Sequence, residues 1–333
     1  MNAPLVRVPS VWLLIGFGLA WSASATAANV SCSASMSALS FGTVDPQSSL
    51  TNSNATLTYT CTNSNNKAYS ATVCFSLGEP AGGPTNPRQM DDGAGHVLNF
   101  QMYQNPTYTL VWGSDYFGTF RTPLTVNLTI AGSGSQSGSA TLYGQVSSGQ
   151  TSAIPGSYND NFSSGDTALT INELKGNVAP GACAGAVTSV GSFPFNITAT
   201  VARRCTVTTG TTLNLGTVAS SATNVSGNNS IVVTCATSTP YYVGLSPSNA
   251  NNVGAGLMVG TGSNTDKVPY QLRSASGLSG TIWGNTSTST SVGNGVAGTG
   301  NGVGQSFTVY ATVTSANYTP DTYTDTVTVN VNY

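Results

Sequence analysis

The stretch that decides the fold is the last one, Asp321–Tyr333, which reads DTYTDTVTVNVNY. Val327, Val329, Val331 and Tyr333 alternate with polar residues, and this period of two is typical of a β-strand with one buried face. We expect no further strand after Tyr333, so this strand should lie at an open edge, to which a strand of another chain can add. The pattern therefore predicts a β-sandwich that accepts a donor strand, with these four residues lining the acceptor groove.

Composition limits the classes of function. The chain has 333 residues, enough for two domains, and only 6% of them are charged, whereas 39% are hydrophobic. The alternating segments argue against disorder, which low charge alone would not exclude. Nine Lys and Arg residues against eleven Asp and Glu residues form no basic patch, so we expect no nucleic-acid partner.

The N-terminus has the pattern of a secretory signal peptide at residues 1–27. Arg7 precedes an apolar run, Val11–Ala20 (VWLLIGFGLA), and small residues follow up to Ala27 and Ala28. The run is shorter than the ~20 residues that a transmembrane helix needs. We therefore expect an exported protein with no membrane span in the mature chain, in a compartment that permits disulfides.

The mature chain contains an internal repeat, which is the strongest signal in the sequence. Each copy has a cysteine, then the motif L-x-[FL]-G-T-V, then a second cysteine at nearly the same spacing. A Trp-Gly pair and a P-x-x-Y-x-D motif follow in the same order. The matched segments are Cys32, Leu39–Val44, Cys61, Trp112 and Pro155–Asp160 in the first copy, and Cys205, Leu213–Val218, Cys235, Trp283 and Pro320–Asp325 in the second.

Both copies are predicted to be all-β, with short strands between glycine- and asparagine-rich turns, as in a sandwich. The predicted domains are 28–184 and 193–333, with a linker at 185–192. The first copy has a further apolar segment, Ala168–Leu174, with which it could complete its own sandwich, whereas the second has none. The strands predicted in the second copy are Phe195–Val201, Ser230–Ala236, Tyr241–Leu245, Val268–Arg273, Ser306–Thr314 and Asp325–Tyr333.

The repeat also restricts how the cysteines can pair. Six cysteines allow 15 pairings. Because Cys32 and Cys61 are equivalent to Cys205 and Cys235, we expect each of these pairs to form a disulfide. Cys74 and Cys183 would then pair within the first domain. The absence of a C-x-x-C motif argues against metal binding or redox chemistry.

Catalytic chemistry has little support. The only histidine, His96, lies in a polar loop beside the adjacent carboxylates Asp91 and Asp92, and no G-x-S-x-G motif provides a nucleophile. Gly293–Gly298 matches G-x-G-x-x-G, but it lies in a low-complexity loop with no helix after it, so it does not indicate a dinucleotide site. We expect a protein that is not an enzyme and has no cofactor or metal.

Three aromatic residues are particular to the first copy: Tyr108, Tyr116 and Phe117. They have two interpretations. They could enlarge the core of the first domain, or they could form an exposed apolar surface that binds a target.

The cysteine spacing, L-x-[FL]-G-T-V and the C-terminal P-x-x-Y-x-D strand resemble the spore coat protein U domain. That domain is the pilin module of archaic (Csu-type) chaperone–usher pili, and two tandem copies resemble the tip adhesin of such pili. The resemblance implies two immunoglobulin-like sandwiches, the second an incomplete pilin fold, and attachment to an abiotic or host surface with biofilm formation. The partners it implies are a periplasmic pilus chaperone, an outer-membrane usher and the donor strand of an adjacent pilin subunit.

The N-terminus favours the tip position within this family. After signal cleavage only about four residues, Ala28–Ser31, precede Cys32, too few for a donor strand that pairs through its main chain. A subunit that accepts a strand without donating one would end the fibre, on the cell surface at the pilus tip. The alternative is a stalk or minor pilin without its own binding site.

Overall fold

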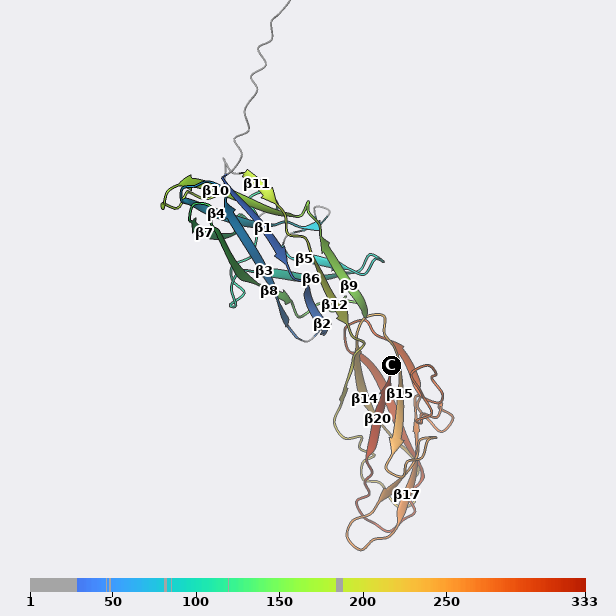
Figure 1. Cartoon of the computed structure of the whole chain (residues 1–333). Helices are drawn as coiled ribbons and strands as arrows, with labels where there is room; N and C mark the ends of the chain where they lie inside the picture. Colours follow the sequence, from blue (N-terminus) through green and yellow to red (C-terminus); the bar gives the residue numbers. More distant parts are fainter. Residues whose placement is uncertain are drawn as a thin grey trace, which may run out of the picture.

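The computed structural model describes residues 29–333, except 46, 48, 81–82, 85, 119 and 184–187. The predicted signal peptide lies outside these residues. The described part of the chain forms twenty strands and no α-helix, and Figure 1 shows two β-sandwiches joined end to end. The all-β prediction with two tandem sandwiches is confirmed. No helix among the described residues is long and apolar enough to span a membrane.

The first domain contains two sheets that enclose one core. The eight-stranded sheet has the order β1-β3-β8-β6-β5-β9-β12-β2, and the four-stranded sheet has the order β11-β10-β4-β7. The strands are β1 (Val30–Met36), β2 (Leu39–Val44), β3 (Thr51–Asn63), β4 (Tyr69–Leu77), β5 (Arg88–Asp91), β6 (Val97–Tyr103), β7 (Leu124–Ile130), β8 (Ser135–Val146), β9 (Gly156–Phe162), β10 (Thr167–Lys175), β11 (Thr188–Gly191) and β12 (Phe195–Val201).

The second domain is smaller and has its own core. A five-stranded sheet, β13-β14-β19-β17-β16, faces a three-stranded sheet, β18-β15-β20. The strands are β13 (Cys205–Thr209), β14 (Thr223–Cys235), β15 (Pro240–Pro247), β16 (Ala255–Val259), β17 (Lys267–Arg273), β18 (Val296–Thr299), β19 (Gln305–Ser315) and β20 (Val327–Asn332).

The repeated motifs have the same structural role in both domains. The indole Nε1 of Trp112 donates to Phe75 O, and that of Trp283 donates to Val243 O, both at 2.8 Å. The tyrosine of each P-x-x-Y motif donates its hydroxyl to the carbonyl four residues earlier, as in the tyrosine corner of immunoglobulin-like folds. These pairs fix which residues of the two domains are equivalent.

Each disulfide joins the pair expected from the repeat. Cys32–Cys61 connects directly opposite residues of β1 and β3, and Cys205–Cys235 does the same for β13 and β14. Cys74–Cys183 connects β4 to the segment that follows β10. This third bridge exists only in the first domain.

One strand lies in a different domain from the one that its position in the repeat predicts. Phe195–Val201 is β12, which pairs antiparallel with β9 and parallel with β2. Phe195, Ile197, Ala199 and Val201 are all buried in the core of the first domain. Because this alternating apolar face fills that core, the strand completes the first sandwich, and the chain enters the second sheet system only at Cys205.

Candidate functional site

The C-terminal strand lies at an open edge of the second domain. β20 is the last strand of its sheet and pairs only with β15 among the described strands. Val327, Val329 and Val331 are half-buried, and Tyr333 is 42% exposed. The three valines pack against the core from one side, and no described strand pairs with the other side of β20.

The equivalent strand of the first domain is fully covered. Leu169 lies opposite Phe75 in β10, as Val331 lies opposite Val243 in β20. β10 is therefore the counterpart of β20, and the segment Ala168–Leu174 is not the additional strand that the sequence suggests. Leu169 is 0% exposed and Ile171 is 3% exposed, because β11 pairs with β10 on its free side.

The L-x-[FL]-G-T-V motif shows the same contrast. In the first domain Leu39, Phe41 and Val44 are buried in β2, which is paired with β12. In the second domain Leu213 and Leu215 are only half-buried, Val218 is 45% exposed, and residues 213–218 form no strand. The glycine of the motif keeps the left-handed conformation in both copies, with φ of 64° at Gly42 and 79° at Gly216.

These two uncovered segments together form what we call the acceptor strip: Leu213, Leu215, Val218, Val327, Val329, Val331 and Tyr333. Residues 213–218 and 327–333 include no Asp, Glu, Lys or Arg. The strip presents apolar side chains at alternate positions together with the free backbone groups of an edge strand. This combination fits an extended apolar segment, which would pair through its main chain and bury alternate side chains.

The aromatic residues singled out in the first domain fall into two places. The rings of Tyr116 and Phe117 lie 6.4 Å apart. Tyr116 is 46% exposed, whereas Phe117 packs over Gly78, where an added Cβ would lie 2.8 Å from its ring. Tyr108 contacts a different set of rings: its centroid lies 5.6 Å from that of Tyr103 and 6.2 Å from that of Tyr143.

A buried ionic cluster holds the main chain at Gly78 and Trp112, beside the loop of Tyr116 and Phe117, and no sequence pattern indicates it. The fully buried Arg88 contacts Glu79 through Nε at 3.1 Å and donates to the main-chain oxygens of Gly78 and Trp112 at 3.1 and 3.0 Å. Burial raises the pKa of Glu79 to about 8, although Arg88 opposes the shift. Burial also raises the pKa of Asp160 to about 7. A single arginine in a short strand has no distinguishing pattern, so only the fold reveals the cluster.

The structure pairs His96 with one of the two adjacent carboxylates. Its Nδ1 lies 2.6 Å from Asp92 Oδ2, and its side chain is exposed. The hydrogen bond from His96 lowers the pKa of Asp92 to about 2. The described residues contain no group of three or more His, Cys, Asp or Glu that could hold a metal ion.

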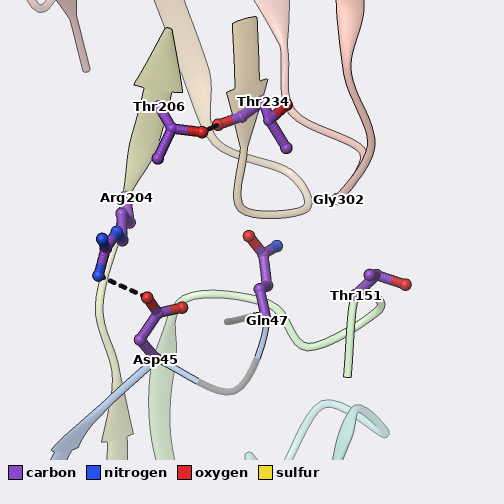
Figure 2. Close-up of a pocket in the computed structure, with 7 residues that line it drawn as sticks. All are labelled: Asp45, Gln47, Thr151, Arg204, Thr206, Thr234 and Gly302. Atoms are coloured by element: carbon purple, nitrogen blue, oxygen red, sulfur yellow. Dashed lines mark hydrogen bonds and ion pairs between the residues drawn. The ribbon is translucent and has the colours of Figure 1, made fainter. Parts of the chain in front are cut away.

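A small pocket of about 160 Å³ lies where the two domains meet, and Figure 2 shows the polar residues and Gly302 that line it. Arg204 donates to Asp45 Oδ2 at 2.6 Å across the junction. The hydroxyl of Thr237 donates to Thr151 O at 2.6 Å, and Gly302 lies directly against Thr151. The contacts join the end of the first sandwich to the cysteine-bridged end of the second.

Comparison with solved structures gives similar proteins at low identity. The chaperone–tip adhesion subunit complex CsuC–CsuE from archaic Csu pili of Acinetobacter baumannii matches with a TM-score of 0.48 and 16% identity, over 91% of this chain and 100% of that chain. The CupB6 tip adhesin from Pseudomonas aeruginosa matches with a TM-score of 0.36 and 11% identity, over 91% and 94%. At this level of similarity neither assigns a function to the chain.

Comparison with known sequences gives a family. None of the curated proteins matches the chain. The model of the Spore Coat Protein U domain matches residues 19–164 and 192–330, once for each copy of the repeat. The chain belongs to the spore coat protein U domain family, with two copies of the domain in tandem.

Proposed function

We propose that this protein is the tip adhesin of a chaperone–usher pilus, with the second domain as the pilin module and the first as the binding module. The observation that carries the proposal is the contrast around β12. The first sandwich is closed by a strand of its own chain, whereas the equivalent residues of the second sandwich form the uncovered acceptor strip. An adjacent pilin subunit would supply the missing strand.

The family match and the sheet boundaries differ in an informative way. The second match begins at residue 192 and so includes β12, although β12 belongs to the first sandwich. A module of this kind therefore begins with a strand that completes the domain before it and ends with a strip that needs a strand from the domain after it. This head-to-tail arrangement is what a fibre of identical contacts requires.

A donor fusion tests the acceptor strip. A donor segment from a stalk subunit, linked after Tyr333 by a flexible linker, should raise the thermal midpoint of the second domain by several degrees. Before a donor arrives, a periplasmic chaperone would cover the strip, and an outer-membrane usher would export the assembled fibre. A matched fusion with one central apolar residue of the donor changed to Asp should give no gain. Equal melting of the unfused and fused chains would contradict an open strip.

The first domain is the proposed site of attachment to an abiotic or host surface, and thereby of biofilm formation. Tyr116 and Phe117, with Tyr108 as a second contact, are the proposed binding residues. Each exposed aromatic ring could contribute about 1–2 kcal/mol to the binding free energy through the apolar area that contact removes from water. Many pili that bind at once would combine these weak contacts into strong attachment.

The test is the triple variant Tyr108→Ser, Tyr116→Ser and Phe117→Ser, which should reduce adhesion to plastic at unchanged pilus number. The equivalent loop of the second domain offers a control in Thr286→Ser. A sharp fall in the thermal midpoint would instead make the three residues part of the core.

A separate experiment tests whether the protein lies at the pilus tip. Immunogold labelling with an antibody against the first domain should mark the ends of pili. Labels along the shaft would instead support the alternative, a stalk or minor pilin. Sequencing the N-terminus of the mature protein adds an independent check, since a donor strand before Cys32 would exclude a terminal position.

A further inference from the structure

The first domain has a second surface feature that the proposed function leaves unused. A depression of about 290 Å³ lies beside the Cys74–Cys183 disulfide, between this bridge and the chain that connects β6 to β7. Leu110, which is 43% exposed, Pro123 and Ala182 supply the rest of its apolar lining. Ligand pockets usually begin at about 300 Å³, so the depression has room for one small ring.

Charged groups of both signs line the same depression. Asp115 contributes a carboxylate that has no hydrogen-bond or ion-pair partner within the described chain, and Arg121 contributes an exposed guanidinium. One Arg121 nitrogen donates to the main-chain oxygen of Asp115, which holds the two residues together and leaves other donors free. Gln104 adds an amide, fixed by a 2.6 Å hydrogen bond from its Nε2 to Thr122 O.

Two features that line the depression have no counterpart in the second domain. The second domain has no counterpart of the Cys74–Cys183 bridge. Where the first domain has Ser114-Asp115 after its Trp-Gly pair, the second has Asn285-Thr286, so it offers no carboxylate. The disulfide and the carboxylate that line the depression are therefore particular to the first domain and are not part of the shared fold.

We propose that this depression binds one neutral sugar residue of a glycan. The inference deepens the proposed adhesive function of the first domain and rests on it. A pyranose has an apolar C–H face, which would lie against Leu110, Pro123 and the disulfide. Its hydroxyls would donate to the Asp115 carboxylate and accept from the Arg121 guanidinium, which are charge-assisted hydrogen bonds. The paired charges favour a neutral ligand, because a carboxylate on the sugar would face Asp115 and an ammonium would face Arg121.

The experiment uses the full mature chain, stabilised by its chaperone, and saturation-transfer NMR. The probes are the methyl glycosides of galactose, glucose, mannose and N-acetylglucosamine at millimolar concentration. We expect saturation of the ring C–H protons of at least one probe. Asp115→Asn should weaken that probe at least fivefold, since an amide offers one acceptor oxygen instead of two. Asp91→Asn, the same change at an exposed carboxylate of the same domain, should leave binding unchanged.

Other outcomes overturn the assignment. Absence of saturation for all four probes would exclude a neutral sugar at this site. Stronger binding of sialic acid that survives Asp115→Asn and is lost in Arg121→Gln would make the ligand an anion. Equal loss in Asp115→Asn and Asp91→Asn, with thermal midpoints unchanged, would place binding elsewhere. None of these results bears on pilus labelling or on adhesion to plastic, so the adhesin proposal stands or falls separately.

Discussion

The two domains carry the same motifs but differ in what covers them. Equivalent apolar residues of the L-x-[FL]-G-T-V motif and of the strand after P-x-x-Y are buried in the first domain and half-exposed or exposed in the second. The difference comes from β11 and β12, which pair with β10 and β2 of the first domain, whereas no described strand pairs with the free side of β20 in the second. A single segment therefore decides which sandwich is closed.

The largest expected effect comes from a charge in the closing strand. Ile197 is 0% exposed, so Ile197→Asp would bury a carboxylate without a partner and should lower the free energy of unfolding of the first domain by about 4 kcal/mol. Val329→Asp, on the half-covered strand of the second domain, should cost only about 1 kcal/mol in the unassembled chain, because its carboxylate can reach water. Differential scanning calorimetry of the full chain measures both transitions.

The difference in destabilisation between Ile197→Asp and Val329→Asp tests whether the two sandwiches are covered to different extents. Equal destabilisation of the two domains would mean that the second sandwich is as well covered as the first. In assembly the order should reverse, with Val329→Asp blocking incorporation into pili because a donor strand would bury the charge.

Much of this fold could be predicted from the sequence. Period-two alternation at Val327–Tyr333 and the spacing of Cys205 and Cys235 identify strands and disulfides, because both signals are local or repeated. The assignment of Phe195–Val201 to a domain could not be predicted, because alternation shows that one face is buried but not which core buries it. The Arg88 cluster could not be predicted either, because its residues come from separate segments that meet only after folding.

The second prediction concerns how stability depends on pH through the equivalent aspartates of the two domains, Asp160 and Asp325. Asp325 accepts a 2.6 Å hydrogen bond from the hydroxyl of Tyr270. The equivalent Asp160 has Phe100 in that place, and its Oδ2 is buried without a hydrogen-bond partner in the described chain. Burial raises the pKa of Asp160 to about 7, with Asp91 and Asp166 adding to the shift and Arg88 opposing it.

Because the folded-state pKa of Asp160 exceeds its unfolded value of about 4, the favourable contribution of this group is full below pH 4 and is lost as the pH rises through 7. Asp160→Asn should therefore stabilise the first domain by about 2 kcal/mol at pH 8 and by almost nothing at pH 4. Thermal melts of both proteins across this range give the difference. Asp325→Asn serves as the control, and a gain of the same size there would remove the distinction between the domains.

The third prediction concerns Tyr270→Phe, which gives the second domain a phenylalanine where the first domain has Phe100. Gly256 lets the ring of Tyr270 lie over the backbone, where the first domain has Arg88 beside Phe100. Tyr270→Phe removes the hydroxyl that reaches Asp325 and should lower the free energy of unfolding by about 1 kcal/mol, the usual net value of one hydrogen bond. Tyr310→Phe is the matched control on a half-exposed tyrosine. An unchanged midpoint for Tyr270→Phe would show that Asp325 needs no partner.

The smallest expected effect is at Tyr108. Its φ of 53° is left-handed, and the corresponding turn of the second domain uses Gly277, with φ of 83°. A left-handed residue with a side chain costs about 1–2 kcal/mol, whereas ring contacts with Tyr103 and Tyr143 return about 0.5–1.5 kcal/mol each. Tyr108→Gly should therefore change the stability of the first domain by less than about 1 kcal/mol, since it removes both the backbone cost and the ring contacts.

Tyr108→Ala keeps the backbone cost but removes the ring contacts, so it should destabilise the first domain by more than Tyr108→Gly does. In the second domain nothing lies within 4 Å of an added Cβ at Gly277, so Gly277→Ala should measure the backbone cost alone. If Tyr108→Gly proves as harmful as Tyr108→Ala, the rings hold the turn in place, and Tyr108 belongs to the framework of the domain and not to its binding surface.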